Sequence, residues 1–208
     1  MYRLTIEALF GELPLEVVAS GTPTTASRLF HEARESLARG DASAAQSALE
    51  EITGLRDVAS LEQIQAWRFL RQLGIRPSSS QEKALLGVIL EIGMGTGGDV
   101  LAVYADLTVH YYNHSGAAAI WMRPDSSLDQ LTRQVVDTAA IVVQKIGPWL
   151  EPRRPAVVGD QLRINMLTPG GLHFGEGPFE ALDRDPVARP VVQAATQLML
   201  ALTALATA

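Results

Sequence analysis

The sequence predicts an α+β protein: an antiparallel sheet with two packed helices, preceded by an N-terminal mainly helical region. Apolar residues recur at helical spacing from about residue 24 to residue 74, whereas beyond a linker at 76–81 they form short runs separated by turn signals. After the linker we expect three or four strands, a helix, a hairpin and a final helix. A parallel doubly wound sheet would need a helix between nearly every pair of strands, so we expect a helical region at 1–80 and an α+β sandwich domain at 82–208.

Composition limits the classes of function. A chain of 208 residues is long enough to bury a sizeable core. The net charge of −6 argues against a nucleic-acid partner, because binding to phosphates depends on Lys and Arg. The absence of cysteine excludes disulfides, thiolate metal sites and cysteine nucleophiles. The first residues lack the basic-then-apolar pattern of a secretory signal, so we expect a cytoplasmic protein.

The first twenty residues predict a pair of strands. Apolar residues alternate along the first half of this segment, at Tyr2, Leu4, Ile6, Ala8 and Phe10. Gly11 and Glu12 would form the turn, and residues 13–18 would return as the second strand.

Residues 24–74 predict a helical hairpin and a third helix. Gly40 and Asp41 interrupt the helical pattern, and a further helix is expected from Ser60 to Gly74. The segment Phe30 to Glu50 is similar to one unit of a tetratricopeptide repeat, a family in which small residues pack two antiparallel helices. Such a unit cannot bury its own apolar face, and no second copy follows at the expected spacing, so we favour a plain helical hairpin.

The second half of the chain contains the predicted strands. We expect strands at 85–92, 100–105, 108–113 and 117–122. A helix should follow, with a cap in the sequence Ser126-Ser127-Leu128-Asp129 and a stop at Gly147-Pro148. Its expected buried stripe consists of Leu128, Leu131, Val135, Ala139, Val142 and Ile146.

A hairpin and a helix complete the predicted domain. The strand at 161–167 should point Leu162, Ile164 and Met166 inward, and Pro169-Gly170 has the residues of a type II turn before a return strand at about 172. The last helix should begin near Pro186. Its uncharged part, 191–208, would barely span a membrane and is interrupted by polar residues, so we expect a core helix rather than an anchor.

The run Ile89-Leu90-Glu91-Ile92-Gly93-Met94-Gly95-Thr96-Gly97-Gly98 resembles the first motif of S-adenosylmethionine-dependent methyltransferases. The resemblance implies a cofactor site formed by Glu91, Gly93, Gly95 and Gly98. That site requires a helix after the turn, over about residues 99–107. The alternative is a hairpin connection, which we favour: the strand that should end in a ribose-binding acid ends in Asn113-His114-Ser115, and too few residues follow for the remaining strand–helix units. We therefore expect no cofactor.

Histidines and tyrosines supply the remaining site candidates. His110 and His114 would chelate one metal ion on a helix, but on a strand they lie ~13 Å apart, so we predict no metal site. His173 lies between glycines that allow a ligand to approach closely, and with Tyr112 it is our candidate for ligand binding.

The sequence Val100–Asp106 followed by Val109–Gly116 looks like a family of uncharacterised bacterial proteins, loosely over residues 84–180. The resemblance implies a strand, an Asp-led turn and a second strand, and it implies no function.

No set of residues has the spacing of a known catalytic motif, so we predict no catalytic residues. We expect a non-catalytic protein–protein interaction or adaptor protein, with a protein partner or self-association through an exposed strand or apolar helix face. Two alternatives stay open: a methyltransferase-like enzyme using the glycine turn, and a small-molecule sensor with a pocket between sheet and helices near His173 and Tyr112.

Overall fold

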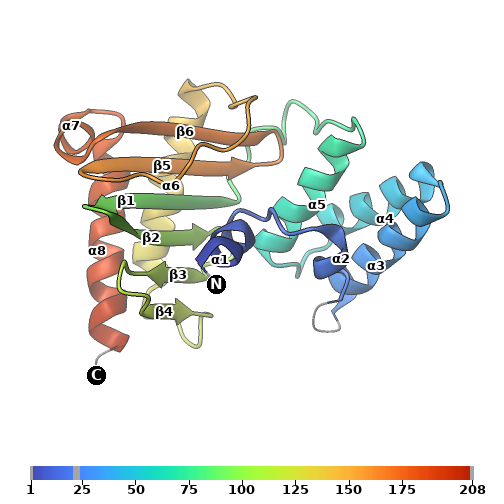
Figure 1. The fold of residues 1–208 in the computed structure, drawn as a ribbon, viewed down its shortest axis with the longest axis horizontal. Helices are drawn as coiled ribbons and strands as arrows, with labels where there is room; N and C mark the ends of the chain where they lie inside the picture. Colours follow the sequence, from blue (N-terminus) through green and yellow to red (C-terminus); the bar gives the residue numbers. More distant parts are fainter. Residues whose placement is uncertain (1, 21–23, 207–208) are drawn as a thin grey trace. The chain divides into compact units, whose positions relative to one another are not determined.

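The computed structural model describes residues 2–20 and 24–206 and has an α+β fold with a six-stranded antiparallel sheet. The chain divides into two compact units, Met1–Glu82 and Lys83–Ala208. The first unit is helical, and the second contains the sheet (Figure 1).

The first unit begins with two short helices, α1 (Tyr2–Leu9) and α2 (Leu15–Val18), where we predicted a pair of strands. That prediction was wrong because Ile6, Leu9 and Phe10, which are buried, also fit helical spacing. Gly11 follows α1 at φ +65, the left-handed conformation that commonly ends a helix. A side chain at Gly11 would lie 2.8 Å from the Ile64 side chain, so glycine also permits close packing there.

Three longer helices complete this unit: α3 (Thr25–Ala38), α4 (Ala42–Gly54) and α5 (Ser60–Gln72). Thr24 and Asp41 cap the first two with hydrogen bonds from the backbone of Ser27 and Ala44. Gly40 makes the tight connection at φ +78. Small buried residues, Ala33 and Ala45 among them, lie in the hairpin of α3 and α4, which confirms the helical hairpin.

The second unit is built on a sheet with the strand order β4-β3-β2-β1-β5-β6. All neighbouring strands are antiparallel. The strands are β1 (Gly87–Met94), β2 (Gly97–Tyr104), β3 (Val109–Tyr112), β4 (Ala118–Trp121), β5 (Gln161–Thr168) and β6 (Gly171–Pro178). Residues 99–112 are therefore strand rather than helix, apart from the turn between β2 and β3.

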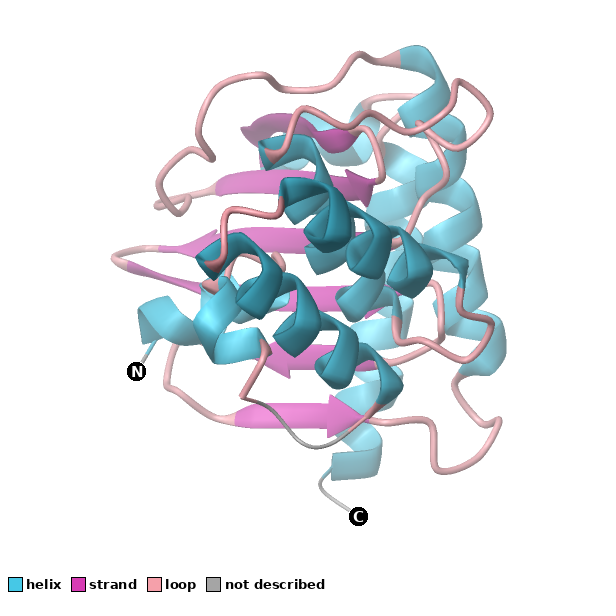
Figure 2. Ribbon diagram, turned by 90° about the vertical axis from the view of Figure 1, so that its right-hand side faces the viewer, coloured by secondary structure: helices cyan, strands magenta, loops and turns pink. Residues whose placement is uncertain are grey.

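Two long helices, α6 (Asp129–Lys145) and α8 (Arg189–Ala206), lie on one face of the sheet, which we call the helix face (Figures 1 and 2). Strand residues of one alternating phase pack against them, including the predicted inward residues Leu162, Ile164 and Met166. Val135, Ala139 and Val143 line the buried side of α6, and Val191 and Leu198 that of α8. The last helix is thus a core helix. Within the described residues, no helix combines the length and apolar character needed to cross a membrane.

Two local predictions need correction. Helix α6 begins at Asp129 and has no side-chain cap, because Leu128 occupies the cap position and its side chain has no hydrogen-bond acceptor. Ser127 lies in a preceding turn, where its backbone N–H donates to Asp125. The turn between β5 and β6 lies at Pro169-Gly170 as expected, but the positive φ is at Gly171, so it is not type II. A short helix that we did not predict, α7 (Phe179–Arg184), follows β6.

The opposite face of the sheet, here called the second face, is crossed by the segment 147–160 between α6 and β5 (Figure 1). Trp149 stacks edge-on against Phe174 of β6, with 5.1 Å between ring centroids. At its far end, Gly159 bridges Gly95 after β1. The segment therefore spans the sheet from β6 to the end of β1.

Candidate functional site

The glycine-rich run Gly93–Gly98 forms the hairpin between β1 and β2. Met94 pairs with Gly97, which leaves the two-residue turn Gly95-Thr96. Gly95 has φ +64, as required at the first position of a type II′ turn. A side chain at Gly93 would lie 2.8 Å from the Val158 carbonyl carbon. These glycines are thus accounted for by the turn and by the approach of segment 147–160, and the strand β2 occupies the place of the helix that a cofactor turn would require.

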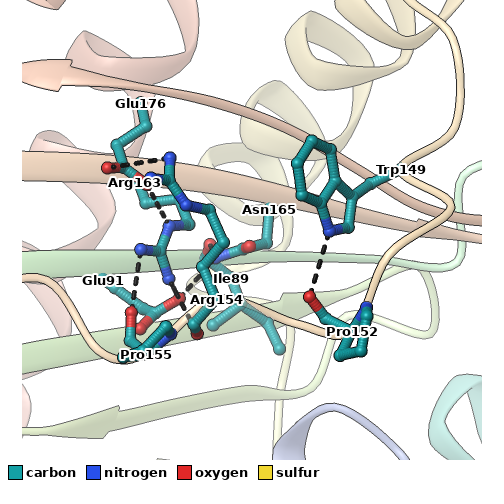
Figure 3. A network of polar contacts seen from close by, with 9 residues as sticks. All are labelled: Ile89, Glu91, Trp149, Pro152, Arg154, Pro155, Arg163, Asn165 and Glu176. Atoms are coloured by element: carbon teal, nitrogen blue, oxygen red, sulfur yellow. Dashed lines mark hydrogen bonds and ion pairs between the residues drawn. The ribbon is translucent and has the colours of Figure 1, made fainter.

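Glu91, the acidic residue of that motif, is tied into a buried polar network on the second face (Figure 3). It lies opposite Arg163 in the pairing of β1 with β5, and its Oε1 is 3.1 Å from Arg163 Nη1. Both side chains are almost fully buried, at 3% and 4% exposure. Asn165 Nδ2 donates to the same Glu91 oxygen and to the carbonyl of Ile89, at 3.0 Å each.

Arg163 joins this pair to segment 147–160. Its Nε donates to Glu176 at 2.6 Å, and Nη2 donates to the carbonyl of Pro155 at 2.8 Å. Arg154 also reaches Glu176, at 3.4 Å (Figure 3). Two arginines and two glutamates thus balance one another, and the buried charges of Glu91 and Arg163 are paired. The arrangement fastens the segment to the sheet and leaves the Glu91 carboxylate enclosed, so we assign it a structural role.

The two candidate ligand-binding residues lie apart. His173 pairs with Met166 and therefore belongs to the helix face, where its side chain is buried. Tyr112 pairs with Val100, on the second face. Three strands, β2, β1 and β5, separate their strands. The structure does not bring His173 and Tyr112 together.

His110 and His114 also point to different sides of the sheet. His110 stacks edge-on against Tyr104 at 5.9 Å between ring centroids, and burial lowers its pKa. His114 lies in the β3–β4 turn, beyond the end of the strand, and contacts Asp99. Asp99 pairs with Ile92 and so lies on the helix face. The separation of ~13 Å assumed that both histidines lie on one strand, but β3 ends at Tyr112 and His114 lies in the turn.

Asp99, Tyr111 and His114 form a compact cluster near the tip of the β1–β2 hairpin. Asp99 Oδ1 accepts the backbone N–H of His114 at 2.8 Å and lies 3.0 Å from its Nδ1, while Oδ2 accepts the Tyr111 hydroxyl at 2.5 Å. The Asp99 side chain is 12% exposed and the His114 side chain 52% exposed. The carboxylate is thus held from three directions, and the imidazole reaches solvent.

The electrostatics of this cluster favour an ionised carboxylate. Burial raises the pKa of Asp99, but hydrogen bonds from Tyr111 and His114 outweigh it, so that the pKa lies below its usual value. Burial and the bond to Asp99 raise the pKa of Tyr111 to about 12. Because an ionised carboxylate only accepts hydrogen bonds, Nδ1 of a neutral His114 must carry the proton, which leaves Nε2 as an acceptor.

The turn that presents His114 is well defined. Gly116 has φ +89 and donates to the Asn113 carbonyl, which is a type I turn followed by a left-handed glycine. Asn113 Oδ1 accepts from the backbone of Ser115 and Ala117 and from the Ser115 hydroxyl. Gly97 makes room for the turn, since a side chain there would lie 3.3 Å from His114 Cβ.

A small apolar cavity lies between the sheet and α8. Its volume of about 10 Å³ leaves room for about one water molecule, far below the usual range of ligand pockets. The single polar group of its lining, Thr196, donates its hydroxyl to the Val192 carbonyl. Neither His173 nor Tyr112 lines the cavity, whose walls come from Leu90, Ile92, Leu101, Leu162, Phe179, Val192, Ala195, Thr196 and Met199.

The strand β4 forms one edge of the sheet and has features of an interaction surface. It is the last strand of the sheet and carries no charge: residues 115–122 read Ser-Gly-Ala-Ala-Ala-Ile-Trp-Met. Asn113 and Ala117 are hydrogen-bonded, so the alternation of an antiparallel ladder turns the N–H and C=O groups of Ala118 and Ile120 away from β3. The side chains of Ile120 and Met122 are 51% and 66% exposed.

Sequence reasoning missed Asp99, Tyr111, Arg163 and Glu176. The alternation of β5 places Arg163 and Asn165 in the phase opposite to its apolar residues, which was a readable signal. Their partner Glu91 depends on the pairing of β1 with β5, two strands separated by about 70 residues of chain, a pairing that periodicity does not reveal.

Comparisons of the chain with protein-family models, with curated proteins and with solved structures found no match. Within residues 2–20 and 24–206, no three acidic or histidine side chains are grouped as a metal site would need. Two surface features of the second unit are the candidates for function, the β4 edge and the Asp99–His114 cluster.

Proposed function

We propose that this protein acts as a protein–protein interaction module, and that its principal contact is a second copy of the chain added to the β4 edge of the sheet. The observation that carries the proposal is an open, uncharged edge strand with outward-facing backbone groups. Unpaired N–H and C=O groups at a sheet edge form a template for another strand.

The two edges of the sheet differ in a way that supports this choice. At β6, Trp149 donates its backbone N–H to the outward carbonyl of Leu172, and Glu176 and Pro178 lie in the strand. Covering segments, charges and prolines are the usual protection of an edge. At β4 the adjoining stretch 115–122 has neither charge nor proline. The β4 edge is therefore the one suited to pairing.

A second copy is the partner that fits this edge best. An antiparallel β4–β4 contact about a two-fold axis places the same uncharged residues opposite one another, so no charge is left unpaired. The C-terminal part of α8 lies beside β4 and carries the exposed Leu205 (Figure 1). Ile120 and Leu205, on the two sides of the edge, would extend the contact beyond the four residues of the strand.

The helical unit is consistent with the same class of function. The hairpin of α3 and α4 resembles a unit that serves protein binding when it is repeated. An adaptor role, with the sheet edge for self-association and the helices for a different protein, would use both units.

Sedimentation velocity over a range of concentrations tests the proposal. We expect the wild-type protein to form a dimer whose population rises with concentration, and Ile120→Lys to remain a monomer because it places a charge at the new strand pair. Ile141→Lys is the matched control: Ile141 is 60% exposed on α6, away from the edge, and its substitution should leave the dimer intact. A wild-type protein that stays monomeric, or a dimer that Ile120→Lys does not weaken, would overturn the proposal.

A further inference from the structure

The Asp99–His114 pair has the arrangement of an acid–base couple. In such couples, a carboxylate fixes one imidazole nitrogen and leaves the other free to exchange a proton. Here Asp99 holds Nδ1 at 3.0 Å and the backbone N–H at 2.8 Å, so both ring and turn are fixed. Within the described residues, Nε2 of His114 has no hydrogen-bond partner, and half of the side chain is exposed.

The charge around the pair selects among substrates. Within the described part of the chain, the hydrogen-bond and ion-pair partners of Asp99 are Tyr111 and His114, and neither is a fixed cation. A phosphate or carboxylate brought to Nε2 would meet the Asp99 charge without an arginine or lysine to compensate it. A neutral substrate fits this site better than an anion.

The surface beside the imidazole is apolar. Met94 pairs with Gly97, and the Met94 side chain is 49% exposed. The Cβ of His114 lies beside Gly97, which has no side chain of its own. On the same face of the sheet, Ile92 pairs with Asp99, and Leu101 follows two residues later on β2. The exposed Met94 side chain offers the acyl group of a substrate an apolar contact beside the imidazole.

We propose that Asp99 and His114 form a general-base site that hydrolyses neutral esters with short apolar acyl groups, an activity additional to the binding role. His114 Nε2 takes a proton from a water molecule as the water oxygen bonds to the carbonyl carbon. The bond from that carbon to the alcohol oxygen then breaks, and the proton passes from Nε2 to the leaving oxygen, which gives one acid and one alcohol. Asp99 is a positioning residue, because it acts through the imidazole.

The test uses 4-nitrophenyl butyrate as the probe, with the full chain and its variants checked for folding by thermal unfolding. We expect His114→Gln to lose most of the activity, by about 100-fold. The matched control is His31→Gln, because His31 is also exposed but lies on α3, where it shares a hydrogen bond with Arg34. Equal rates for wild type and His114→Gln would overturn the proposal. An equal loss in His31→Gln would also overturn it, because it would indicate unspecific imidazole catalysis.

A second measurement requires no variant. Nitrogen-15 NMR of the wild-type protein reports which ring nitrogen of each neutral histidine carries the proton, and we expect Nδ1–H for His114. Asp99→Asn should shift His114 toward the other tautomer and lower the rate together, which a purely structural role of Asp99 would not do. Finding Nε2–H in the wild-type protein would contradict the site, since Nε2 then has no lone pair for the water proton.

Discussion

Glu91 and Arg163 lie directly opposite each other on neighbouring strands, and their ion pair at 3.1 Å is almost closed off from solvent. Removing one partner leaves the other charge buried, so we expect Glu91→Ala to lower the free energy of unfolding by about 3–5 kcal/mol in urea titrations. Glu180→Ala, which breaks the exposed pair with Arg184, is the control and should cost less than about 0.5 kcal/mol. Similar losses in both variants would contradict the structural role of the network.

A double replacement separates the cost of an orphaned charge from the value of the pair. Glu91→Leu combined with Arg163→Met removes both charges, and buried pairs replaced by apolar residues are often neutral in stability. We expect the double variant to recover a large part of the loss seen in Glu91→Ala. If it is less stable than Glu91→Ala, the bonds of Arg163 to Glu176 and Pro155 contribute more than the pair itself.

Gly93 tests the hairpin interpretation of the glycine-rich run. An added Cβ would lie 2.8–2.9 Å from backbone atoms of Val158 and Gly159, which cannot move aside as a side chain would. We expect Gly93→Ala to cost about 1–3 kcal/mol of unfolding free energy. Gly175→Ala is the control, because Gly175 is also in a strand and has open space around it. An unaffected Gly93→Ala variant would show that segment 147–160 does not pack there.

Asp99 should make the free energy of unfolding depend on pH in the acid range. Its pKa in the folded protein is below its usual value near 3.8, so its contribution is present above about pH 4 and is lost as pH falls through the folded-state pKa. We expect the wild type to be more stable than Asp99→Asn at pH 7 and the difference to shrink at pH 3. Urea titrations at the two pH values measure it, and a difference that grows in acid would have the wrong sign.

The hydrogen bond between Tyr111 and Asp99 should also affect the pKa of Tyr111 and the stability of the protein at alkaline pH. Its pKa of about 12 arises first from burial and then from the hydrogen bond to Asp99. The stabilisation is present below the ordinary pKa of 10 and is lost as pH rises through about 12. In Asp99→Asn we expect the Tyr111 pKa to fall part of the way back, measured by phenolate absorbance against Tyr111→Phe. An unchanged pKa would assign the shift to burial alone.

Features that depend on residues close in the chain could be predicted from the sequence. Contacts that depend on the pairing of distant strands mostly could not. The alternation of Leu162, Ile164 and Met166 predicted an inward strand face, and Gly40 with Asp41 predicted the break between α3 and α4, because each depends on neighbouring residues. The strands expected at residues 2–20 were wrong, because a short apolar run fits the period of a helix as well as that of a strand.

The clusters could not be predicted because each joins distant residues. Glu91 meets Arg163 and Asn165 through the β1–β5 register. Asp99 meets His114 because the β3–β4 turn folds back beside β2, a contact that depends on where β3 ends. Strand ends and register are set by packing between segments, which a periodic pattern does not contain.

Hydrogen exchange at the β4 edge tests the central proposal most directly. In the part of the chain that the structure describes, no strand pairs with the outward amides of Ala118 and Ile120, whereas in a β4–β4 pair they would form hydrogen bonds. We predict that their exchange slows as protein concentration rises, while the outward amides of Phe174 and Glu176 on the opposite edge exchange at unchanged rates. Exchange at Ala118 and Ile120 that does not depend on concentration would contradict self-association through this strand.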